Sequence, residues 1–142
     1  MRVRELMTGA LITVSPETPV FEARERMLKE RIRHLIVLEH GRLVGLVTDR
    51  DIRLRLPSKA ASLSLSEVDY LLARLTVEDV MSRPVTTVGP DPRAHEAARI
   101  MLEHKIGALP VVDGERLIGI ITKTDLLRAF VHLADEPAGA RR

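Results

Sequence analysis

The stretch GLVTDRD, residues 45–51, joins an apolar run to a charged one through Thr48 and ends in an acid, Asp51. Its apolar first half is typical of a strand, and a Thr followed three residues later by an acid is typical of a helix N-terminus. The same device returns as GIITKTD at residues 119–125. Each stretch therefore predicts a strand that leads directly into a helix, and its recurrence predicts a duplicated unit.

An internal repeat accounts for this recurrence. A shift of 74 residues lays residues 3–56 on residues 77–130 without a gap. The identical pairs include Met7/Met81, Thr13/Thr87, Pro16/Pro90, Ala23/Ala97, Met27/Met101, Leu35/Leu109, Val37/Val111, Leu43/Leu117, Gly45/Gly119, Thr48/Thr122 and Asp51/Asp125. Because self-similarity at a fixed period marks a repeat architecture, we infer two copies of one unit.

Each copy predicts the same order of elements, which is an opening helix followed by strand, helix, strand, strand and helix. The expected ranges of the first three elements are 3–7, 11–14 and 19–31 in the first copy and 77–81, 85–88 and 92–105 in the second. Apolar residues at helical spacing mark the long helices, and a nearby proline suits the first helical position. Pro92 aligns one residue before Pro19, so the second long helix is expected to begin slightly differently.

The remaining elements follow from turn and cap residues. Short apolar runs flank His40-Gly41 in the first copy and Asp113-Gly114 in the second, which predicts two hairpins. A final helix is expected after each Thr-x-x-Asp motif.

The repeat also predicts the domain boundaries. The expected division is repeat 1 at 1–56, a linker at 57–76, repeat 2 at 77–133 and a tail at 134–142. Pro57 ends the preceding helix, and the Ser- and Ala-rich residues after it are typical of a linker. Apolar residues at helical spacing predict a short helix at 68–75 that packs on the core. The tail is predicted to be flexible.

Composition limits the class of protein. A chain of 142 residues suits one domain or two small halves that share a core. Because there is no Cys, disulfides and thiolate metal sites are excluded, which agrees with a reducing compartment. No apolar run approaches the ~20 residues that cross a bilayer. We expect a soluble, cytoplasmic protein without membrane contact.

Charge disfavours nucleic-acid binding. The net charge is +2, with ten Lys and Arg against eight Asp and Glu in residues 3–56 and seven against eight in residues 77–130. A duplex-binding surface usually shows a denser basic stripe, and one Tyr with two Phe and no Trp offers few base-stacking platforms. The mild basic excess of the first copy suits an anion instead.

Catalytic and metal-binding motifs are missing from the sequence. The five His residues are scattered without zinc-ligand spacing. Neither a G-x-S-x-G elbow nor a Walker-type phosphate loop is present. We therefore expect no enzyme activity, no metal and no required cofactor.

Two interpretations of the Thr-x-x-Asp motif remain open. In the structural one, the Thr and the acid cap a helix, and Gly45 and Gly119 allow close backbone packing. In the functional one, the helix N-terminus attracts a phosphate, the acid accepts bonds from both hydroxyls of a ribose, and the glycine leaves room for a flat ring. Adenosine phosphates satisfy all three features.

The doubled pattern of Met, Thr-Val, Pro, Glu-Ala, Met-Leu, Leu-x-Val, Arg-Leu-x-Gly and Thr-x-x-Asp closely resembles the cystathionine-β-synthase (CBS) domain. Two such domains in tandem resemble the pair called a Bateman module. The resemblance covers residues 3–56 and 77–130. A weaker resemblance, carried by VDYLLARL at 68–75, is to the CBS part of acetoin-utilisation-type bacterial regulators, in which a CBS pair precedes an ACT domain.

The resemblance implies an α/β (α+β) fold in which two βαββα repeats pack through their sheets about a pseudo-twofold axis. Two clefts then form, and each takes AMP, ADP, ATP, S-adenosylmethionine or a related adenosyl ligand as effector. One copy supplies an Asp to the ribose, and the other surrounds the adenine and the phosphate. Carried over to this sequence, the first and favoured cleft consists of Asp125, Thr122, Thr8, Ile12, Ile32, Arg33 and His34. The second consists of Asp51, Thr48, Ser82, Thr86, Ile106, Gly107 and Ala108.

The two clefts differ where the phosphate is expected. Arg33 offers a planar fork for phosphate oxygens and His34 adds charge near neutral pH, whereas Gly107 and Ala108 offer backbone alone. A solvated strand edge is the structural alternative for Arg33 and His34. We therefore expect the Asp125 cleft to bind phosphorylated adenosine more tightly than the Asp51 cleft.

The sequence thus predicts a regulatory module that senses an adenosine-containing ligand and passes its occupancy to a partner or a further domain. Family members commonly pair through helical faces, so we expect a homodimer. The alternatives are a structural or interaction module with vacant clefts, an enzyme acting on nucleotides and a nucleic-acid-binding protein.

Overall fold

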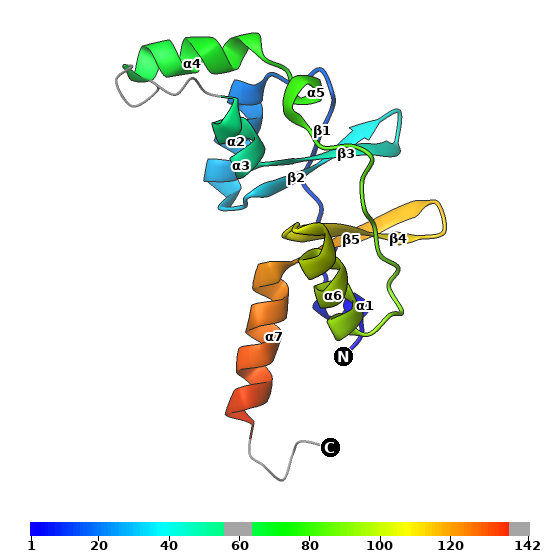
Figure 1. Cartoon of the computed structure of the whole chain (residues 1–142). Helices are drawn as coiled ribbons and strands as arrows, with labels where there is room; N and C mark the ends of the chain where they lie inside the picture. Colours follow the sequence, from blue (N-terminus) through cyan, green and yellow to red (C-terminus); the bar gives the residue numbers. More distant parts are fainter. Residues whose placement is uncertain (56–63, 137–142) are drawn as a thin grey trace. The chain divides into compact units, whose positions relative to one another are not determined.

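The computed structural model describes residues 1–55 and 64–136 (Figure 1). In chain order its elements are α1 (Val3–Leu6), β1 (Thr13–Val14), α2 (Val20–Glu30), β2 (His34–Glu39), β3 (Arg42–Thr48), α3 (Asp49–Leu54), α4 (Leu65–Arg74), α5 (Val77–Val80), α6 (Ala94–His104), β4 (Ala108–Asp113), β5 (Arg116–Thr122) and α7 (Lys123–Asp135). The α/β class predicted from the sequence is confirmed. Tertiary contacts divide the chain into a continuous unit, Ile12–Val85, and a split unit made of Met1–Leu11 with Thr86–Arg142.

The opening segment of each copy lies in the unit that holds the rest of the other copy. Helix α1, from the first copy, packs against α6 and α7 in the split unit, where Val3 is fully buried. Helix α5, from the second copy, places Val77 and Val80 in the core of the continuous unit. The structural units therefore differ from the sequence repeats by an exchange of their first helices.

Backbone hydrogen bonds show the same exchange. The bonds of one unit are related to those of the other by the shift of 74 residues. In each unit, the opening segment that comes from the other copy (called the imported opening segment) forms hydrogen bonds with the residues just before and at the start of the long helix. The bonds are Val77 N–H to Thr18 O (2.8 Å), Glu78 N–H to Pro16 O (3.0 Å) and Val20 N–H to Leu75 O (2.8 Å), matched by Val3 N–H to Pro92 O (3.0 Å), Arg4 N–H to Pro90 O (2.9 Å) and Ala94 N–H to Met1 O (2.8 Å). Exchange therefore satisfies backbone groups at the N-terminus of both long helices.

The continuous unit contains a three-stranded sheet in the order β1-β2-β3. Strand β1 pairs in parallel with β2, and β2 pairs with β3 as an antiparallel hairpin. The hairpin turn contains His40 with φ 51° and Gly41 with φ 76°. Two successive left-handed residues suit a two-residue hairpin turn because their twist matches that of the strands. Both predicted hairpins are confirmed.

The sheet of the split unit has only β4 and β5 within the described residues. The predicted strand at 85–88 is wrong, because it is reduced to one parallel bridge between Val88 and Val111. Val88 N–H donates to Pro110 O (3.1 Å), and Val112 N–H donates to Val88 O (2.9 Å). The next bond of a parallel ladder would run from the N–H of residue 110 to Thr86 O, and proline has no N–H to donate.

The long helices begin at equivalent positions. Helix α2 begins at Val20 and α6 at Ala94, so Pro19 is an N-cap and Pro92 lies before the N-cap residue Arg93. The expected difference between the two helix starts, and the placing of each proline at the first helical position, are therefore wrong. The imported backbone bonds to Val20 and Ala94 set the same start in both units.

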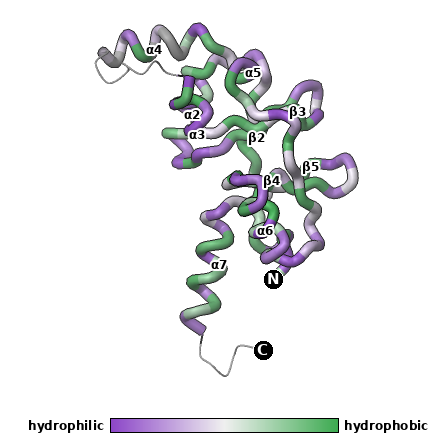
Figure 2. Tube along the Cα trace, viewed as in Figure 1, coloured by the Kyte–Doolittle hydropathy of each residue, from purple (hydrophilic) through white to green (hydrophobic). Residues whose placement is uncertain are grey.

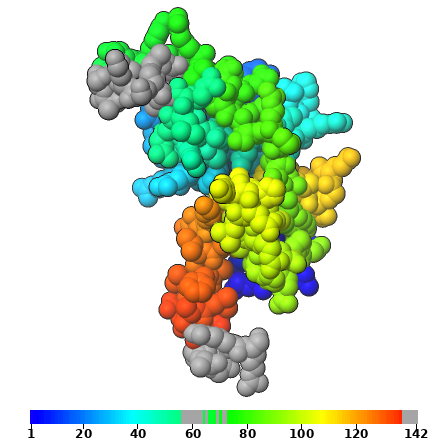
Figure 3. Space-filling view, viewed as in Figure 1, coloured from blue at the N-terminus to red at the C-terminus, as the bar shows by residue number. Residues whose placement is uncertain are grey.

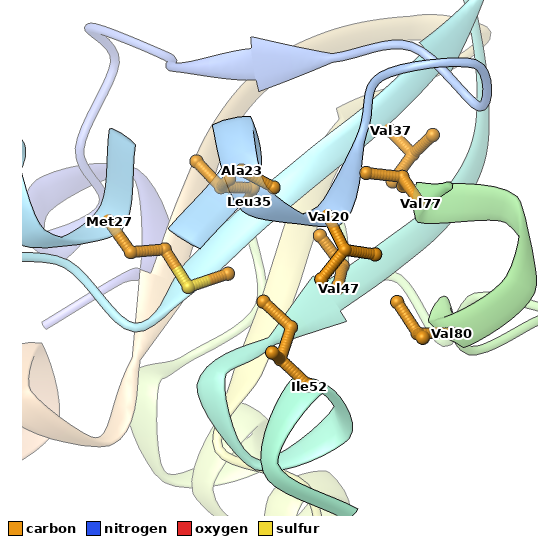
Figure 4. Packing of buried hydrophobic residues seen from close by; sticks show 9 residues of the cluster. All are labelled: Val20, Ala23, Met27, Leu35, Val37, Val47, Ile52, Val77 and Val80. Carbon is orange, nitrogen blue, oxygen red and sulfur yellow. The ribbon is translucent and has the colours of Figure 1, made fainter. Parts of the chain in front are cut away.

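Each unit has its own hydrophobic core. In the continuous unit the core joins α2, β2, β3, α3 and α5 through Val20, Ala23, Met27, Leu35, Val37, Val47, Ile52, Val77 and Val80 (Figure 4). In the split unit it consists of Val3, Val88, Ala97, Met101, Leu109, Val111 and Ile121. Hydrophobic residues accordingly dominate β2 and β4 in Figure 2. Burial of Val3 from α1 and of Val77 and Val80 from α5 stabilises the exchanged arrangement.

Helix α4 confirms the helix predicted within residues 68–75 and begins three residues earlier, at Leu65. It packs beside α2, and Val68 and Leu75 contact the core of the continuous unit. The predicted linker residues 57–63 lie outside the described residues. Of the predicted tail, α7 includes residues 134 and 135, and residues 137–142 lie outside the described part. None of the helices described is long and apolar enough to cross a membrane.

Candidate functional site

The Thr-x-x-Asp motif forms a reciprocal cap at the start of α3 and α7. Thr48 N–H donates to Asp51 Oδ2 (2.9 Å), and Thr48 Oγ1 accepts from Asp51 N–H (3.1 Å). The corresponding distances for Thr122 and Asp125 are 2.8 Å and 3.3 Å. The Thr122 hydroxyl also donates to Asp125 Oδ2 (3.1 Å). The structural interpretation of the motif is therefore confirmed in both copies.

Capping leaves each carboxylate with acceptor capacity. Asp51 and Asp125 are half-buried, and the hydrogen bonds that they accept from the capping threonines go to Oδ2. An ionised carboxylate offers about four lone-pair sites on its two oxygens. Oδ1 can therefore accept a hydroxyl while Oδ2 holds the cap, so capping and ribose binding are compatible roles.

The start of each hairpin lies beside the capped helix of its own unit. The contacts are Asp49 N–H to Arg33 O (3.0 Å) with His34 opposite Thr48 in the continuous unit, and Lys123 N–H to Gly107 O (3.0 Å) with Ala108 opposite Thr122 in the split unit. Arg33 is exposed and His34 is half-buried. The continuous unit thus presents a guanidinium and an imidazole at a position where the split unit presents backbone and a methyl group.

The two units divide the predicted site residues between them. The split unit holds Thr8, Thr86, Ile106, Gly107, Ala108, Thr122 and Asp125. The continuous unit holds Ile12, Ile32, Arg33, His34, Thr48, Asp51 and Ser82. Each predicted cleft therefore draws on both units, and its grouping across them stays a prediction.

Thr8 and Ser82 lie beside the strands that end in the capping threonines. Thr8 forms an antiparallel bridge with Ile120 through two backbone hydrogen bonds (2.9 and 3.0 Å), and Ser82 forms one with Leu46 (2.8 and 3.2 Å). Residues opposite each other in an antiparallel pair share a face, as do residues two apart on one strand. Thr8 therefore shares a face with Thr122, and Ser82 shares one with Thr48.

Methionines of the opening segments fill the space over the strand glycines. A Cβ on Gly45 would lie 2.5 Å from Met81 Sδ, and a Cβ on Gly119 would lie 2.7 Å from Met7 Sδ. The predicted close backbone packing is confirmed at Gly119, where Thr8 O lies 3.0 Å from the Cβ position, whereas the nearest atoms at Gly45 belong to the Met81 side chain. At both glycines a thioether takes the room that the functional interpretation gave to a flat ring. The sequence carried a signal for this contact, because both the Met and the Gly are identical in the two copies.

These features define a tandem α/β repeat in which each unit ends its hairpin in a capped helix. Within residues 1–55 and 64–136, no group of three or more His, Asp or Glu is arranged to hold a metal ion. A family model for the CBS domain matches residues 3–58 and 77–132. The chain belongs to the CBS domain family, of which it contains two copies in tandem.

Curated relatives agree with this assignment. The CBS domain-containing protein YhcV of Bacillus subtilis is 32% identical over 138 residues, which cover 97% of this chain and 90% of that protein. Several other relatives are much longer. The chain spans 23% of a homoserine O-acetyltransferase from Methanococcoides burtonii, to which it is 39% identical over 128 residues and 89% of its own length.

Solved structures show the same fold. A protein with CBS domains from Burkholderia ambifaria has a TM-score of 0.80 at 27% identity, covering 96% of this chain and 97% of that one. The acetoin utilization protein AcuB of Vibrio cholerae has a TM-score of 0.76 at 29% identity, covering 96% and 98%. The CBS domain pair of protein MJ0100, in complex with 5′-methylthioadenosine and S-adenosyl-L-methionine, has a TM-score of 0.74 at 29% identity, covering 93% and 97%.

Proposed function

We propose that the chain is a non-catalytic regulatory module that binds an adenosine-containing effector. The observation that carries the proposal is the pair of capped carboxylates, Asp51 and Asp125, each able to accept a hydroxyl through Oδ1 at the end of a hairpin. Membership of the CBS family supports the ligand class, as does the MJ0100 pair bound to 5′-methylthioadenosine and S-adenosyl-L-methionine. No cofactor is required.

In the favoured site, Asp125 accepts the ribose hydroxyls and Thr122 fixes that carboxylate. Thr8, on the same face as Thr122, contacts the ligand from the imported opening segment. Ile12 and Ile32 surround the adenine, and Arg33 and His34 meet the phosphate. The second site has Asp51, Thr48 and Ser82 in these roles, with Thr86, Ile106, Gly107 and Ala108 completing it.

Regulation follows from the division of each proposed site between two units. A ligand that contacts both units favours the relative arrangement in which both sets of contacts are made. Its differential affinity for that arrangement is the signal that a partner protein or further domain detects. We place this activity in the cytoplasm, in keeping with the absence of Cys.

Thermal unfolding tests the proposal cheaply. AMP, ADP, ATP and S-adenosylmethionine are each added at increasing concentration, and the melting temperature is followed. A ligand at 100 times its Kd stabilises the folded state by about 2.7 kcal/mol, so the melting temperature rises with concentration. If no adenosine compound raises it, the rival function, an interaction module with vacant sites, is favoured.

We also propose a homodimer, and helix α7 supports it. The exposed fractions of Leu127, Phe130 and Val131 are 64%, 68% and 56%, and their spacing places them in one stripe. Helix α7 has 13 residues where its counterpart α3 has 6, so Phe130 and Val131 lie beyond the part of α7 that matches α3. The side chains of α7 form open surface in Figure 3, and hydrophobic residues recur along it in Figure 2. Contiguous exposed apolar surface of this kind marks interaction sites.

The oligomeric state is measured by light scattering after gel filtration. Phe130→Glu is expected to convert a dimer into a monomer, because it puts a charge in the apolar stripe, whereas Arg128→Ala on the same helix leaves the dimer intact. A wild-type chain that runs as a monomer at all concentrations contradicts the dimer.

A further inference from the structure

We propose that Met7 and Met81 are positioning residues that hold Thr8 and Ser82 in the two ligand sites. The inference deepens the proposed function and rests on it. It starts from the neighbouring placement of each Met and its polar successor, Met7 with Thr8 and Met81 with Ser82, in segments that belong to one copy by sequence and to the other by packing.

The opening segments leave their helices in extended conformation. Met7 has φ −68° and ψ 157°, and Met81 has φ −64° and ψ 153°. Successive side chains of an extended chain point to opposite faces. Met7 and Met81 accordingly pack against the cores, while Thr8 and Ser82 are exposed on the face of the capping threonines.

Each thioether fits against a glycine because the strand has no Cβ there. The three atoms nearest to a hypothetical Cβ on Gly45 all belong to Met81, with Sδ at 2.5 Å, Cγ at 3.1 Å and Cβ at 3.4 Å. A Cβ on Gly119 approaches Met7 Sδ at 2.7 Å and also the backbone oxygen of Thr8 at 3.0 Å. The Met–Gly contact therefore fixes how closely each segment lies on its strand.

The same contact fixes which residue faces the ligand. Each bridge consists of a single residue pair, Thr8 with Ile120 and Ser82 with Leu46, so the bridge alone specifies register weakly. A slip of one residue would turn the polar side chain to the opposite face. In these registers Met81 is opposite Val47 and Met7 is opposite Ile121, and each thioether lies over the glycine two residues away on the same face. A slip of one residue would turn the thioether to the face of Leu46 or Ile120, whose large side chains would stand where the glycine now leaves room.

The structure supplies a compensation test that differs between the units. Gly45→Ala pushes Met81 and displaces Ser82, whereas adding Met81→Ala removes Sδ and Cγ and leaves an ordinary contact at 3.4 Å. Gly119→Ala also presses on the Thr8 carbonyl at 3.0 Å, which Met7→Ala does not relieve. We therefore expect rescue by the double variant in the continuous unit and incomplete rescue in the split unit.

The first measurement needs no ligand. Amide hydrogen exchange of Ser82, whose N–H donates to Leu46 O, and of Thr8, whose N–H donates to Ile120 O, reports how each segment sits on its strand. Gly45→Ala is expected to speed exchange at Ser82 and not at Thr8, and G45A/M81A to restore it. Gly119→Ala is expected to speed exchange at Thr8, with partial restoration by Met7→Ala.

The second measurement is AMP affinity at each site, with the other site disabled by Asp51→Ala or Asp125→Ala. Loss of one hydrogen bond is a roughly three- to tenfold loss of affinity. Gly45→Ala is expected to weaken the Asp51 site by this factor and leave the Asp125 site unchanged, with recovery in G45A/M81A. Gly119→Ala is expected to weaken the Asp125 site by this factor and to leave the Asp51 site unchanged.

A merely structural role for the methionines gives different results. Equal weakening of both sites by Gly45→Ala, or faster Ser82 exchange with unchanged affinity at the Asp51 site, would overturn the positioning role and leave the proposed function intact. Absence of AMP, ADP, ATP and S-adenosylmethionine binding by the wild-type chain would overturn the proposed function and the positioning role with it.

Discussion

At the scale of residues, the geometry of the capping acids is compatible with two roles, the observed cap and the proposed ribose contact. The cap needs Oδ2 and a backbone N–H, and the proposed ribose contact needs Oδ1. Local sequence was sufficient to predict the caps, because the partners are three residues apart and their bonds depend on local backbone alone. The methionine contacts were not predicted, because Met7 and Gly119 are far apart in the chain.

Removing a cap hydroxyl should destabilise the ligand-free chain. Thr122→Ala is expected to lower the free energy of unfolding by about 1 kcal/mol, because Thr122 Oγ1 accepts from Asp125 N–H at the start of α7. Urea unfolding followed by circular dichroism measures the change. Thr124→Ala is the matched control, since this exposed Thr two residues along lies outside the cap, and an equal loss there would contradict the assignment.

A third cap predicts a pH effect. Hydrogen bonds from the Thr76 backbone N–H (2.8 Å) and hydroxyl (3.1 Å) lower the pKa of Asp79 below its ordinary value of 3.8. Because the folded-state pKa is the lower one, the cap contributes stability above pH 3.8 that is lost as the pH falls through the lowered pKa. NMR titration of the Asp79 carboxyl is expected to show this lowered pKa in the wild type and a smaller lowering in Thr76→Ala, which loses the hydroxyl and keeps the backbone N–H. An unchanged titration in Thr76→Ala would contradict it.

At the scale of elements, the sequence could not predict that the opening helices are exchanged between the two units. The 74-residue repeat gives each unit the same residue types whether an opening helix packs on its own copy or on the other. Hydrophobic pattern therefore cannot separate the two arrangements. The absence of a strand at 85–88 in the split unit could have been predicted from the sequence. Pro110 replaces Ile36, and a proline within a strand prevents a ladder bond.

The exchange predicts where a core substitution acts. Val3→Ala is expected to cost about 1–3 kcal/mol and to loosen the split unit, because Val3 is fully buried with Leu109 and Ile121. Amide exchange should rise at Leu109 and Ile121 and stay unchanged at Leu35 and Val47. Val77→Ala is the matched variant, for which amide exchange should rise at Leu35 and Val47 and stay unchanged at Leu109 and Ile121. Loosening of Leu35 by Val3→Ala would show that the first helix packs on its own copy.

At the scale of the whole molecule, the sequence predicted a duplicated α/β fold and the family, and both are confirmed. The order of elements within each copy was predictable because periodicity, turn residues and caps act over short distances. The make-up of the two units was not, because it depends on packing between residues far apart in the chain. The proposed sites remain a prediction that combines the caps seen here with the ligand class of the family.

Calorimetric titration of AMP into the wild-type chain, Asp125→Ala and Asp51→Ala measures this proposal most directly. Melting of each variant without ligand confirms that it is folded. The wild type is expected to bind AMP, with Asp125→Ala abolishing the tighter phase because Arg33 and His34 serve that site, and Asp51→Ala removing the weaker one. Binding that is the same in all three chains would contradict the assignment of the capped carboxylates to the ligand.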